Sequence, residues 1–378
     1  MITPVCSGVG ERTAVLIAQR PSPTKPFITL AIPQYNRREY LQVGLESIFQ
    51  QTFGDFDILV SDDGSSDDSN DVIPALLEHS RRSFQYYAQR ENLGYDHNVR
   101  FCLSAARGTY VMMLGNDDAL VAPDTLGDVA RALRALGAPH VAVANYQDWE
   151  SGQLTRRAYG TRLIGQGPGI AAQHFRAFSF TSGLIYKQKE ASRHESDKWD
   201  KSIYYQMYLA CRIIASGGSF AGIDLSVVRD HIRLRGELFS GTYRIKYKNA
   251  LFSLKPKHTG LDSVARVTLD AIIPCIEPHE RSSVIKAIWK QIYLITYPYW
   301  ILEYRSIANW GIGFGVARDL WPGDRLREYR LKSLDRIYLW FLYFAVTPAA
   351  LIIPPRLFNK VRHRLADYLR RKRQDGHR

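Results

Sequence analysis

Two acidic turns of the chain each follow a short apolar segment. The pair Asp117-Asp118 comes shortly after residues 110–114, and the pair Asp62-Asp63 follows residues 56–61. A short β-rich segment that ends in carboxylates places them at the carboxyl end of a strand, which is where ligands bind in open α/β sheets. Adjacent carboxylates repel each other unless a cation joins them. Together, the two turns predict a site for a diphosphate held by a metal ion.

The segments that must position these turns alternate between strands and helices from residue 27 onward. Apolar runs predict strands, and apolar residues spaced by three and four positions predict helices. The expected strands are 27–32, 56–61, 83–88, 109–114, 140–144, 179–187 and 221–228, and the expected helices are 38–51, 68–79, 95–106, 122–136 and 202–216. This order predicts an α/β fold with a Rossmann-like, mainly parallel sheet and helices on both faces.

The composition is that of a folded chain. Its 378 residues are 46% hydrophobic and 23% charged, which excludes a disordered protein. The four cysteines, at positions 6, 102, 211 and 275, are too far apart for a metal-ligand spacing or a disulfide framework. They predict reduced thiols in a cytosolic compartment. Apolar residues 14–18 are too few for a signal peptide and follow Glu11 and Arg12, so export is not expected.

Three parts are expected along the chain. Residues 1–25 are expected to be a flexible leader, residues 26–240 hold the alternating strands and helices, and residues 241–378 are helical, aromatic and basic. The formal net charge is +13, and residues 356–378 carry nine Lys or Arg against two Asp. Such a tail suits an anionic surface, either lipid headgroups or nucleic acid, unless it is simply a solvated end.

Residues 337–353 contain no charged side chain over 17 positions. A spanning helix needs about 20 apolar residues, and Pro348 interrupts this segment. The aromatic side chains of Tyr338, Trp340 and Tyr343 suit a membrane–water interface. Interfacial or re-entrant attachment, a buried core helix and a true span all stay open. In either membrane case the basic flank predicts that the tail faces the cytoplasm.

Five motifs, in order and at matching spacing, resemble the nucleotide-sugar-binding half of a family 2 glycosyltransferase with the GT-A fold. They are Ile32-Pro33-Gln34-Tyr35-Asn36, Val60 to Asp67, Asn92-Leu93-Gly94 with Asn98, Ala106 to Tyr110, and Asn116-Asp117-Asp118. The resemblance covers residues 27–120 and extends more weakly to about residue 235. An acidic turn shaped by Gly64 and a helix-capping turn at 116–118 are the structural alternatives.

The resemblance implies a site for a nucleoside-diphosphate sugar. The nucleotide-sugar-binding residues would be Pro33, Tyr35, Asn36, Arg38, Asp62, Asp63, Asn92, Asn98, Asn116 and Asp117. Asp118 corresponds to the last acid of the family's DXD motif, which holds Mg²⁺ or Mn²⁺ on the diphosphate, while Asn116 replaces the first acid. His231 stands where some relatives place a histidine near the metal, although a structural or solvated histidine is the alternative.

Similar family members invert the anomeric centre, which needs a base for the acceptor hydroxyl. Many carry a Glu-Asp pair at the start of the helix that here ends near residue 217, but this chain has Tyr205 and Gln206 there. Because an amide cannot act as the base, Asp200 is the substitute candidate, followed by Asp197 and Glu195. For each of these acids, an exposed position in the charged segment 193–201 is the structural alternative.

The resemblance therefore implies a hexosyl- or deoxyhexosyltransferase of surface polysaccharide synthesis, similar to the O-antigen type. Its acceptor would be a saccharide on a polyprenyl diphosphate lipid, and its place the cytoplasmic face of the inner membrane, as a peripheral or monotopic protein bound to an anionic surface. A catalytically silent scaffold is a further alternative, because Gln206 replaces the expected acid.

Two other function classes fit the sequence less well. A sugar-phosphate nucleotidyltransferase would carry a Gly-rich basic loop after the first strand, where this chain has Pro33 to Asn36. A nucleic-acid-binding protein would show a recognition motif or aromatic residues interleaved with the basic ones, and neither accompanies the tail. No nucleic-acid partner is therefore expected.

Overall fold

A computed structural model describes residues 14–234, 261–307, 310–354, 356–358 and 360. The chain divides into two compact units. Unit 1 comprises Met1–Gly165, Arg176–Ile214 and Gly218–Ser240, and unit 2 comprises Gln166–Phe175, Ala215–Gly217 and Gly241–Arg378. The basic tail beyond residue 360 and the first thirteen residues of the expected leader lie outside the described residues.

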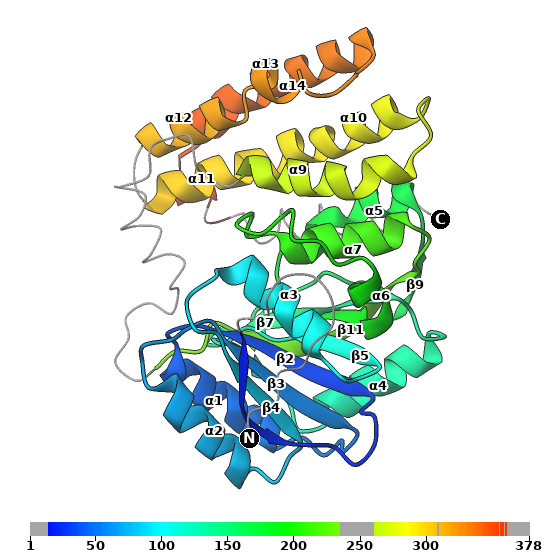
Figure 1. The fold of residues 1–378 in the computed structure, drawn as a ribbon. Helices are drawn as coiled ribbons and strands as arrows, with labels where there is room; N and C mark the ends of the chain where they lie inside the picture. The colour runs from blue at the N-terminus through cyan, green and yellow to red at the C-terminus, as the bar shows by residue number, and fades with distance from the viewer. Residues whose placement is uncertain (1–13, 235–260, 308–309, 355, 359, 361–378) are drawn as a thin grey trace. The chain divides into compact units, whose positions relative to one another are not determined.

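Within the described residues, the strands of unit 1 form a single sheet in the order β1-β4-β3-β2-β5-β10-β7-β11-β6, with β8 beside β7 and β9 beside β11 (Figure 1). Their bounds are β1 Val15–Arg20, β2 Ile28–Gln34, β3 Phe56–Asp62, β4 Phe84–Ala88, β5 Tyr110–Met113, β6 Ala119–Leu120, β7 Val141–Asp148, β8 Leu154–Thr155, β9 Arg162–Gly165, β10 Leu184–Lys187 and β11 Phe220–Asp230. Strands β4, β3, β2 and β5 are parallel, as are β7 and β11, whereas β10 runs antiparallel between β5 and β7.

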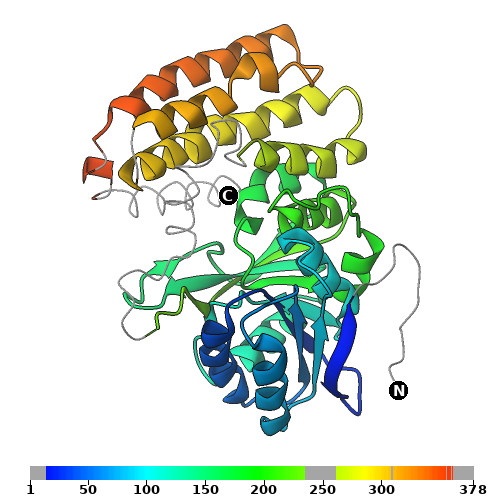
Figure 2. The same cartoon turned by 60° about the vertical axis from the view of Figure 1, so that its left-hand side comes forward.

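The helices of unit 1 cover both faces of this sheet. They are α1 Arg38–Phe49, α2 Ser69–His79, α3 Tyr95–Ala105, α4 Thr125–Ala135, α6 Gln188–Arg193 and α7 Tyr205–Ala215, and a 3₁₀ turn spans Phe175–Phe178. Helices α1, α2 and α4 lie on one face, and α3, α6 and α7 lie on the other (Figures 1 and 2). The expected α/β architecture is therefore confirmed.

Burial explains the central strands. Every residue of β2 and β3 is buried, as expected for parallel strands that are covered on both faces. Leu30 and Val60 belong to the same core as Leu41 and Leu45, which lie on the apolar stripe of α1. In the parallel register Gln34 is opposite Asp62, which brings the ends of the two strands together.

Residues 15–20, within the segment expected to be a flexible leader, instead form strand β1. It pairs antiparallel with β4 at the edge of the sheet. Partly buried and exposed residues alternate along most of β1, which is the pattern of a strand with one covered face. The ion pair between Arg20 Nη2 and Glu78 Oε2, at 2.8 Å, joins this edge to α2. The apolar segment that is too short for a signal peptide is thus an edge strand.

Unit 2 is helical in its described residues. Its helices are α5 Pro168–His174, α9 Leu261–Ile272, α10 Arg281–Gln291, α11 Tyr297–Ile307, α12 Trp310–Asp319, α13 Pro322–Arg325 and α14 Ser333–Ile352, with a 3₁₀ turn at Ile273–Cys275 and a π-helical stretch at Ile292–Thr296. Buried aromatic rings form its core, and the Tyr293 and Tyr297 rings lie 5.7 and 5.6 Å from that of Tyr343. The expected helical and aromatic character is confirmed for these residues.

Among the described helices, α14 is long and apolar enough to cross a membrane. About a third of it is buried within the protein, and core helices of soluble proteins share that composition, so length and hydropathy alone are weak support for a span.

Candidate active site

Gln34, the last residue of β2, joins the two acidic turns. Its side-chain Oε1 accepts a hydrogen bond from Asn116 Nδ2 at 2.8 Å, and its backbone oxygen accepts one from the amide of Asp63 at 2.9 Å. Its Nε2 donates to Ser69 Oγ at 2.9 Å, so the buried side-chain amide is engaged at both ends. Because β2 lies between β3 and β5, the turns that follow those strands meet at the end of β2.

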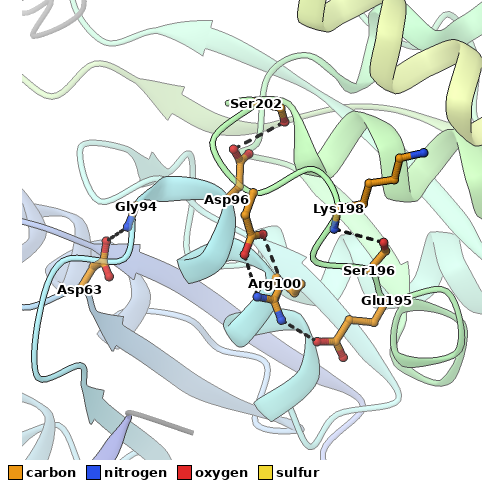
Figure 3. Close-up of polar contacts among 9 residues, drawn as sticks. Asp63, Gly94, Asp96, Arg100, Glu195, Ser196, Lys198 and Ser202 are labelled. Carbon is orange, nitrogen blue, oxygen red and sulfur yellow. Dashed lines mark hydrogen bonds and ion pairs between the residues drawn. The ribbon is translucent and has the colours of Figure 1, made fainter. Parts of the chain in front are cut away.

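The turn that contains Asp62 and Asp63 is buried and shaped by backbone hydrogen bonds. Asp62 Oδ1 accepts a bond from the amide of Ser65 at 2.7 Å. The two oxygens of Asp63 accept bonds from the amides of Leu93 and Gly94, each at 2.9 Å. Figure 3 shows the bond from Gly94. Burial raises the pKa of Asp62 and raises that of Asp63 to about 6. Asp63 thereby fastens the segment after β4 to the turn after β3.

The residues after β2 line the outer side of this turn. Tyr35 is exposed, and Asn36 Oδ1 accepts a hydrogen bond from the amide of Ser66 at 2.8 Å. The backbone amide of Arg38 donates to Asp67 Oδ2 at 2.9 Å. Asn36 and Arg38 therefore lie beside the first acidic turn, and the prediction that Tyr35, Asn36 and Arg38 line a nucleotide pocket stays a prediction.

The remaining predicted residues of this half differ in exposure. Pro33 is buried in β2 opposite Ser61, and Asn98 is buried where Nδ2 donates to the backbone oxygens of Ser61 and Gln34 at 2.9 and 3.2 Å. Asn92 is exposed. Pro33 and Asn98 therefore support the strand ends from within the protein, whereas Asn92 lies on its surface.

Asp118 is the buried carboxylate of the second turn. Its Oδ1 accepts a hydrogen bond from the amide of His231 at 2.9 Å, and its Oδ2 accepts one from the hydroxyl of Ser182. Ser182 Oγ in turn accepts a bond from the amide of Gly115 at 2.8 Å. Burial, with a smaller contribution from the adjacent Asp117, raises the pKa of Asp118. Segments next to β10 and β11 thus hold this carboxylate in place.

Asp117 is paired with Arg37 and not with the neighbouring Arg38. Arg37 Nη1 lies 2.6 Å from Asp117 Oδ2, and both side chains are largely covered. A Cβ atom at Gly115 would lie 3.2 Å from Asp117 Oδ1 and 2.8 Å from Asp118 Oδ2. One oxygen of each carboxylate therefore lies close to Gly115, on the same side of it.

This pair of carboxylates fits a hard cation whose remaining coordination positions are filled by a ligand. In the part of the chain that the structure describes, no group of three or more His, Cys, Asp or Glu side chains could hold a metal by itself. Mg²⁺ usually takes only one or two protein carboxylates, and it fills its remaining positions with water and phosphate oxygens. The donors beside Gly115 match that requirement.

His231 reaches the second turn through its backbone. Besides the bond from its amide to Asp118, the next amide, of Ile232, donates to the backbone oxygen of Asp117 at 2.7 Å. The backbone of His231 is left-handed, with φ of 61°. Its ring Nδ1 lies 3.1 Å from Asp230 Oδ2, and this hydrogen bond raises the pKa of His231. The end of β11 and the second turn are thereby joined at two points.

Asp200 forms an ion pair with Arg100 of α3, and the same guanidinium reaches Glu195 (Figure 3). Arg100 Nη2 lies 2.8 Å from Asp200 Oδ2 and Nε lies 3.3 Å from Oδ1, while Nη1 lies 3.1 Å from Glu195 Oε1. Asp197 is exposed. Among the described residues, no hydrogen bond or ion pair joins the Asp200 carboxylate to either acidic turn. Asp200 and Glu195 therefore both contact Arg100, and neither contacts the acidic turns within the described residues.

The start of α7, where an acid pair was expected, is anchored by other contacts. Gln206 is buried, and its Nε2 donates to the backbone oxygen of Ser179 at 3.1 Å. The carboxylate of Asp96 accepts bonds from the amides of Ile203 and Tyr205 at 2.6 and 3.0 Å. Gln206 thus serves to hold the segment that leads to Ser182.

The family model described as glycosyl transferase family 2 matches residues 29–192. These residues belong to glycosyl transferase family 2. They include both acidic turns and the strands that present them, so the family assignment agrees with the resemblance seen in the five motifs. The family 2 domain defined in this way ends before the start of α7 and before His231.

Curated relatives match parts of the chain. It is 39% identical over 206 residues to abequosyltransferase RfbV of Salmonella typhimurium, covering 48% of this chain and 57% of the relative. It is 34% identical over 96 residues to GalNAc(5)-diNAcBac-PP-undecaprenol beta-1,3-glucosyltransferase of Campylobacter jejuni, covering 25% of this chain and 31% of the relative. The chain spans less than two thirds of the length of each of these relatives.

Solved structures share the fold. TarS 1–349 of S. aureus in complex with UDP has a TM-score of 0.55 and 13% identity, and the match covers 86% of this chain and 89% of that one. The mannosyltransferase PcManGT of Pyrobaculum calidifontis, in complex with GDP-Man and Mn²⁺, has a TM-score of 0.50 and 16% identity over 88% of this chain and 89% of that one. The expected GT-A fold is confirmed.

Three polar residues of this family 2 domain were not foreseen as site residues. Gln34 and Arg37 lie in or beside the first motif, so their position next to Asn36 was a signal that could have found them. Ser182 carries no such signal, because 64 positions separate it from Asp118 and only the sheet brings the two together.

Proposed function

We propose that this chain transfers a sugar from a nucleoside-diphosphate sugar to a saccharide acceptor. The observation that carries the proposal is the junction at Gln34, which brings the turn after β3 and the turn after β5 to one edge of the sheet. Ligands of open α/β sheets bind at that edge. Membership of residues 29–192 in a glycosyltransferase family and the transferases among the relatives support the same reaction.

The first turn would bind the nucleoside. Asp62 and Asp63 could accept hydrogen bonds from a base imide or from ribose hydroxyls, with Tyr35, Asn36 and Arg38 beside them. Pro33, Asn92, Asn98 and Asn116 complete the proposed donor site. Both oxygens of Asp63 already accept hydrogen bonds from the backbone of residues 93–94, and Asp62 is fully buried.

The second turn would bind the diphosphate. Asp118, with Asp117 and more weakly His231, would hold Mg²⁺ or Mn²⁺, and the donors next to Gly115 support this assignment. Such a cation, when bound, neutralises the charge that develops on the departing nucleoside diphosphate. Arg37, which forms an ion pair with Asp117, adds a positive side chain to the same edge of the sheet. The Mn²⁺ in the complex of the mannosyltransferase PcManGT supports the use of a divalent cation without deciding which one.

We propose an inverting reaction in which Asp200 takes the proton of the acceptor hydroxyl, with Asp197 as the weaker candidate. A base must be held in a fixed orientation, and the ion pair with Arg100 orients the Asp200 carboxylate. The guanidinium engages both oxygens, so an acceptor hydroxyl would have to use the lone pairs that Arg100 leaves free.

The acceptor would be a saccharide on a polyprenyl diphosphate lipid, and the transferred sugar a hexose or deoxyhexose. The PP-undecaprenol in the name of the Campylobacter relative and the abequosyl group in that of the Salmonella relative support these two suggestions. Such an acceptor would place the protein on the cytoplasmic face of the inner membrane, in surface polysaccharide synthesis. The proposal includes no nucleic-acid partner.

A thermal-shift and calorimetric screen of UDP, GDP, CDP and dTDP, each with and without Mn²⁺, tests the proposal. We expect one nucleotide to stabilise the protein in a metal-dependent manner, and we expect Asp118→Ala to abolish that response. Asp128→Ala, at a partly buried position of α4, is the matched control and should respond like the wild type. If none of the four nucleotides binds under either condition, the proposed donor site is wrong.

A further inference from the structure

Helix α14 exposes an apolar stripe along its whole length. The stripe consists of five large side chains with exposed fractions of 81, 63, 67, 55 and 70%: Leu334, Ile337, Phe341, Phe344 and Ile352. Their spacing by three, four or eight residues puts them on one side of the helix, together with the exposed Ala345 and Pro348. From its first to its last residue, the stripe is about 27 Å long. No charged side chain of α14 interrupts it.

The opposite side of α14 is fastened to the helices of unit 2. The hydroxyl of Tyr343 donates to the backbone oxygen of Ala317 at 2.7 Å, and Thr347 shares a hydrogen bond of 2.7 Å with Tyr297. Near the carboxyl end, Arg305 Nη1 donates to the backbone oxygen of Ala350 at 2.7 Å.

Helices α12, α13 and α14 form one layer of this unit over α9, α10 and α11 (Figures 1 and 2). To cross a bilayer by itself, α14 would have to break the three contacts of its inner side. The stripe is therefore a surface of the folded unit and not one side of a free helix.

Indole rings border the stripe. The Trp321 ring lies 4.9 Å from that of Trp340 and 5.9 Å from that of Phe344, and Trp340 stacks on Phe344 at 5.6 Å. Trp321 is itself 36% exposed. Tryptophan is enriched at the level of lipid headgroups, where its ring is apolar and its N–H remains hydrated.

The charges around the stripe are basic. Lys332 and Arg336 are exposed near its amino end, and Arg356 and Lys360 are exposed beyond its carboxyl end. Asp335 is the acid between residues 332 and 360. Its Oδ1 forms an ion pair with Lys286 Nζ at 2.7 Å. A second copy of this face would bring like charges together, whereas anionic headgroups would neutralise them.

We propose that the α14 stripe docks in the plane of an anionic lipid surface, with Leu334, Ile337, Phe341, Phe344 and Ile352 in the headgroup–acyl boundary and the four cations on the headgroups. This is how amphipathic helices lie on membranes without crossing them. The inference rests on the membrane location included in the proposed function, and it deepens that location by naming the contact face and excluding a span.

Flotation of the full chain with vesicles tests the docking face. We expect binding to phosphatidylcholine vesicles that contain about one third phosphatidylglycerol, with much weaker binding to pure phosphatidylcholine. The double variant Ile337→Glu/Phe341→Glu should bind at least about tenfold more weakly. Leu163→Glu, at an exposed apolar position on β9 of unit 1, is the matched control and should bind like the wild type. Alkaline carbonate should release the wild-type protein from the vesicles.

Three results would overturn the proposal. Undiminished flotation of the double variant would show that another surface contacts the vesicles. Wild-type protein that stays on the vesicles in alkaline carbonate would indicate a span. A wild-type dimer that the double variant converts to a monomer, without vesicle binding by either, would identify the stripe as an interface between copies.

The nucleotide screen separates this inference from the donor-site proposal. Circular dichroism and the nucleotide response of the double variant should match those of the wild type, because both substitutions are at exposed positions of unit 2. If the double variant loses vesicle binding while neither protein binds a nucleotide, the docking face is supported and the donor-site proposal is wrong.

Discussion

Arg37 Nη1 lies 2.6 Å from Asp117 Oδ2, so one guanidinium compensates one of the two adjacent carboxylates of the second turn. The other carboxylate, Asp118, accepts hydrogen bonds from two uncharged donors, the hydroxyl of Ser182 and the amide of His231. The charge balance of the turn therefore depends on a residue beside the first motif.

Replacing Arg37 should weaken diphosphate binding. In Arg37→Met, Asp117 loses its cation, and the more negative turn repels the phosphates, so we expect the dissociation constant of the preferred nucleotide to rise roughly tenfold without metal. Saturating Mn²⁺ should narrow the difference, because the cation would supply the missing charge. Titration calorimetry measures both values. Arg131→Met, at an exposed position of α4, is the matched control, and an equal loss in both variants would contradict the assignment.

Removing the hydroxyl of Ser182 should destabilise the protein and loosen the second turn. Ser182→Ala takes a donor from the buried Asp118 carboxylate, and leaving such a group short of a partner costs about 1–3 kcal/mol of unfolding free energy. Urea denaturation measures the loss. Ser179→Ala, three residues earlier and exposed, should change the free energy of unfolding by less than about 0.5 kcal/mol. Equal effects of the two substitutions would show that the Ser182–Asp118 contact contributes little.

Local patterns predicted the centre of the sheet well. The expected strands 27–32 and 56–61 correspond to Ile28–Gln34 and Phe56–Asp62, because a parallel strand covered on both faces is a continuous apolar run. Strands β1, β6, β8 and β9 were not predicted. Edge strands are short or half exposed, so their partners, and not their own residues, decide their conformation.

The candidate site was predicted in part for a related reason. Asp62 and Asp118 could be found because they end strand-like segments, and the parallel order brings strand ends together. The donors to Asp118 come from residues 182 and 231, and only the completed sheet shows that these segments meet. The contacts of Asp200 with Arg100 could not be predicted from local patterns either, since they join segments a hundred positions apart.

Ionisation of Asp63 should make the stability of the protein depend on pH. Burial raises its pKa from 3.8 to about 6 in the folded protein, so the folded state binds the proton more tightly than the unfolded state does. This contribution to stability is fully present below about pH 4, the unfolded-state pKa, and is lost as the pH rises through 6.

Relative to Asp63→Asn, the wild type should therefore lose up to about 3 kcal/mol of unfolding free energy between pH 4 and pH 7. Urea denaturation of both proteins across this range measures the difference. Parallel pH profiles would show that Asp63 does not titrate in this interval.

The proposed base can be separated from a structural brace by comparing the two partners of one ion pair. Asp200→Asn keeps the shape of the side chain but cannot take a proton, so turnover should fall by about 10²- to 10⁴-fold. Arg100→Met breaks the same pair but leaves the carboxylate, so its turnover should stay within about tenfold of the wild type. Slow hydrolysis of the donor, with water in place of the acceptor, allows the comparison before the acceptor is known. Melting temperatures of both variants show whether the fold is retained. If both variants lose the same activity and the same stability, the pair braces residues 195–200 against α3, and the base is another group.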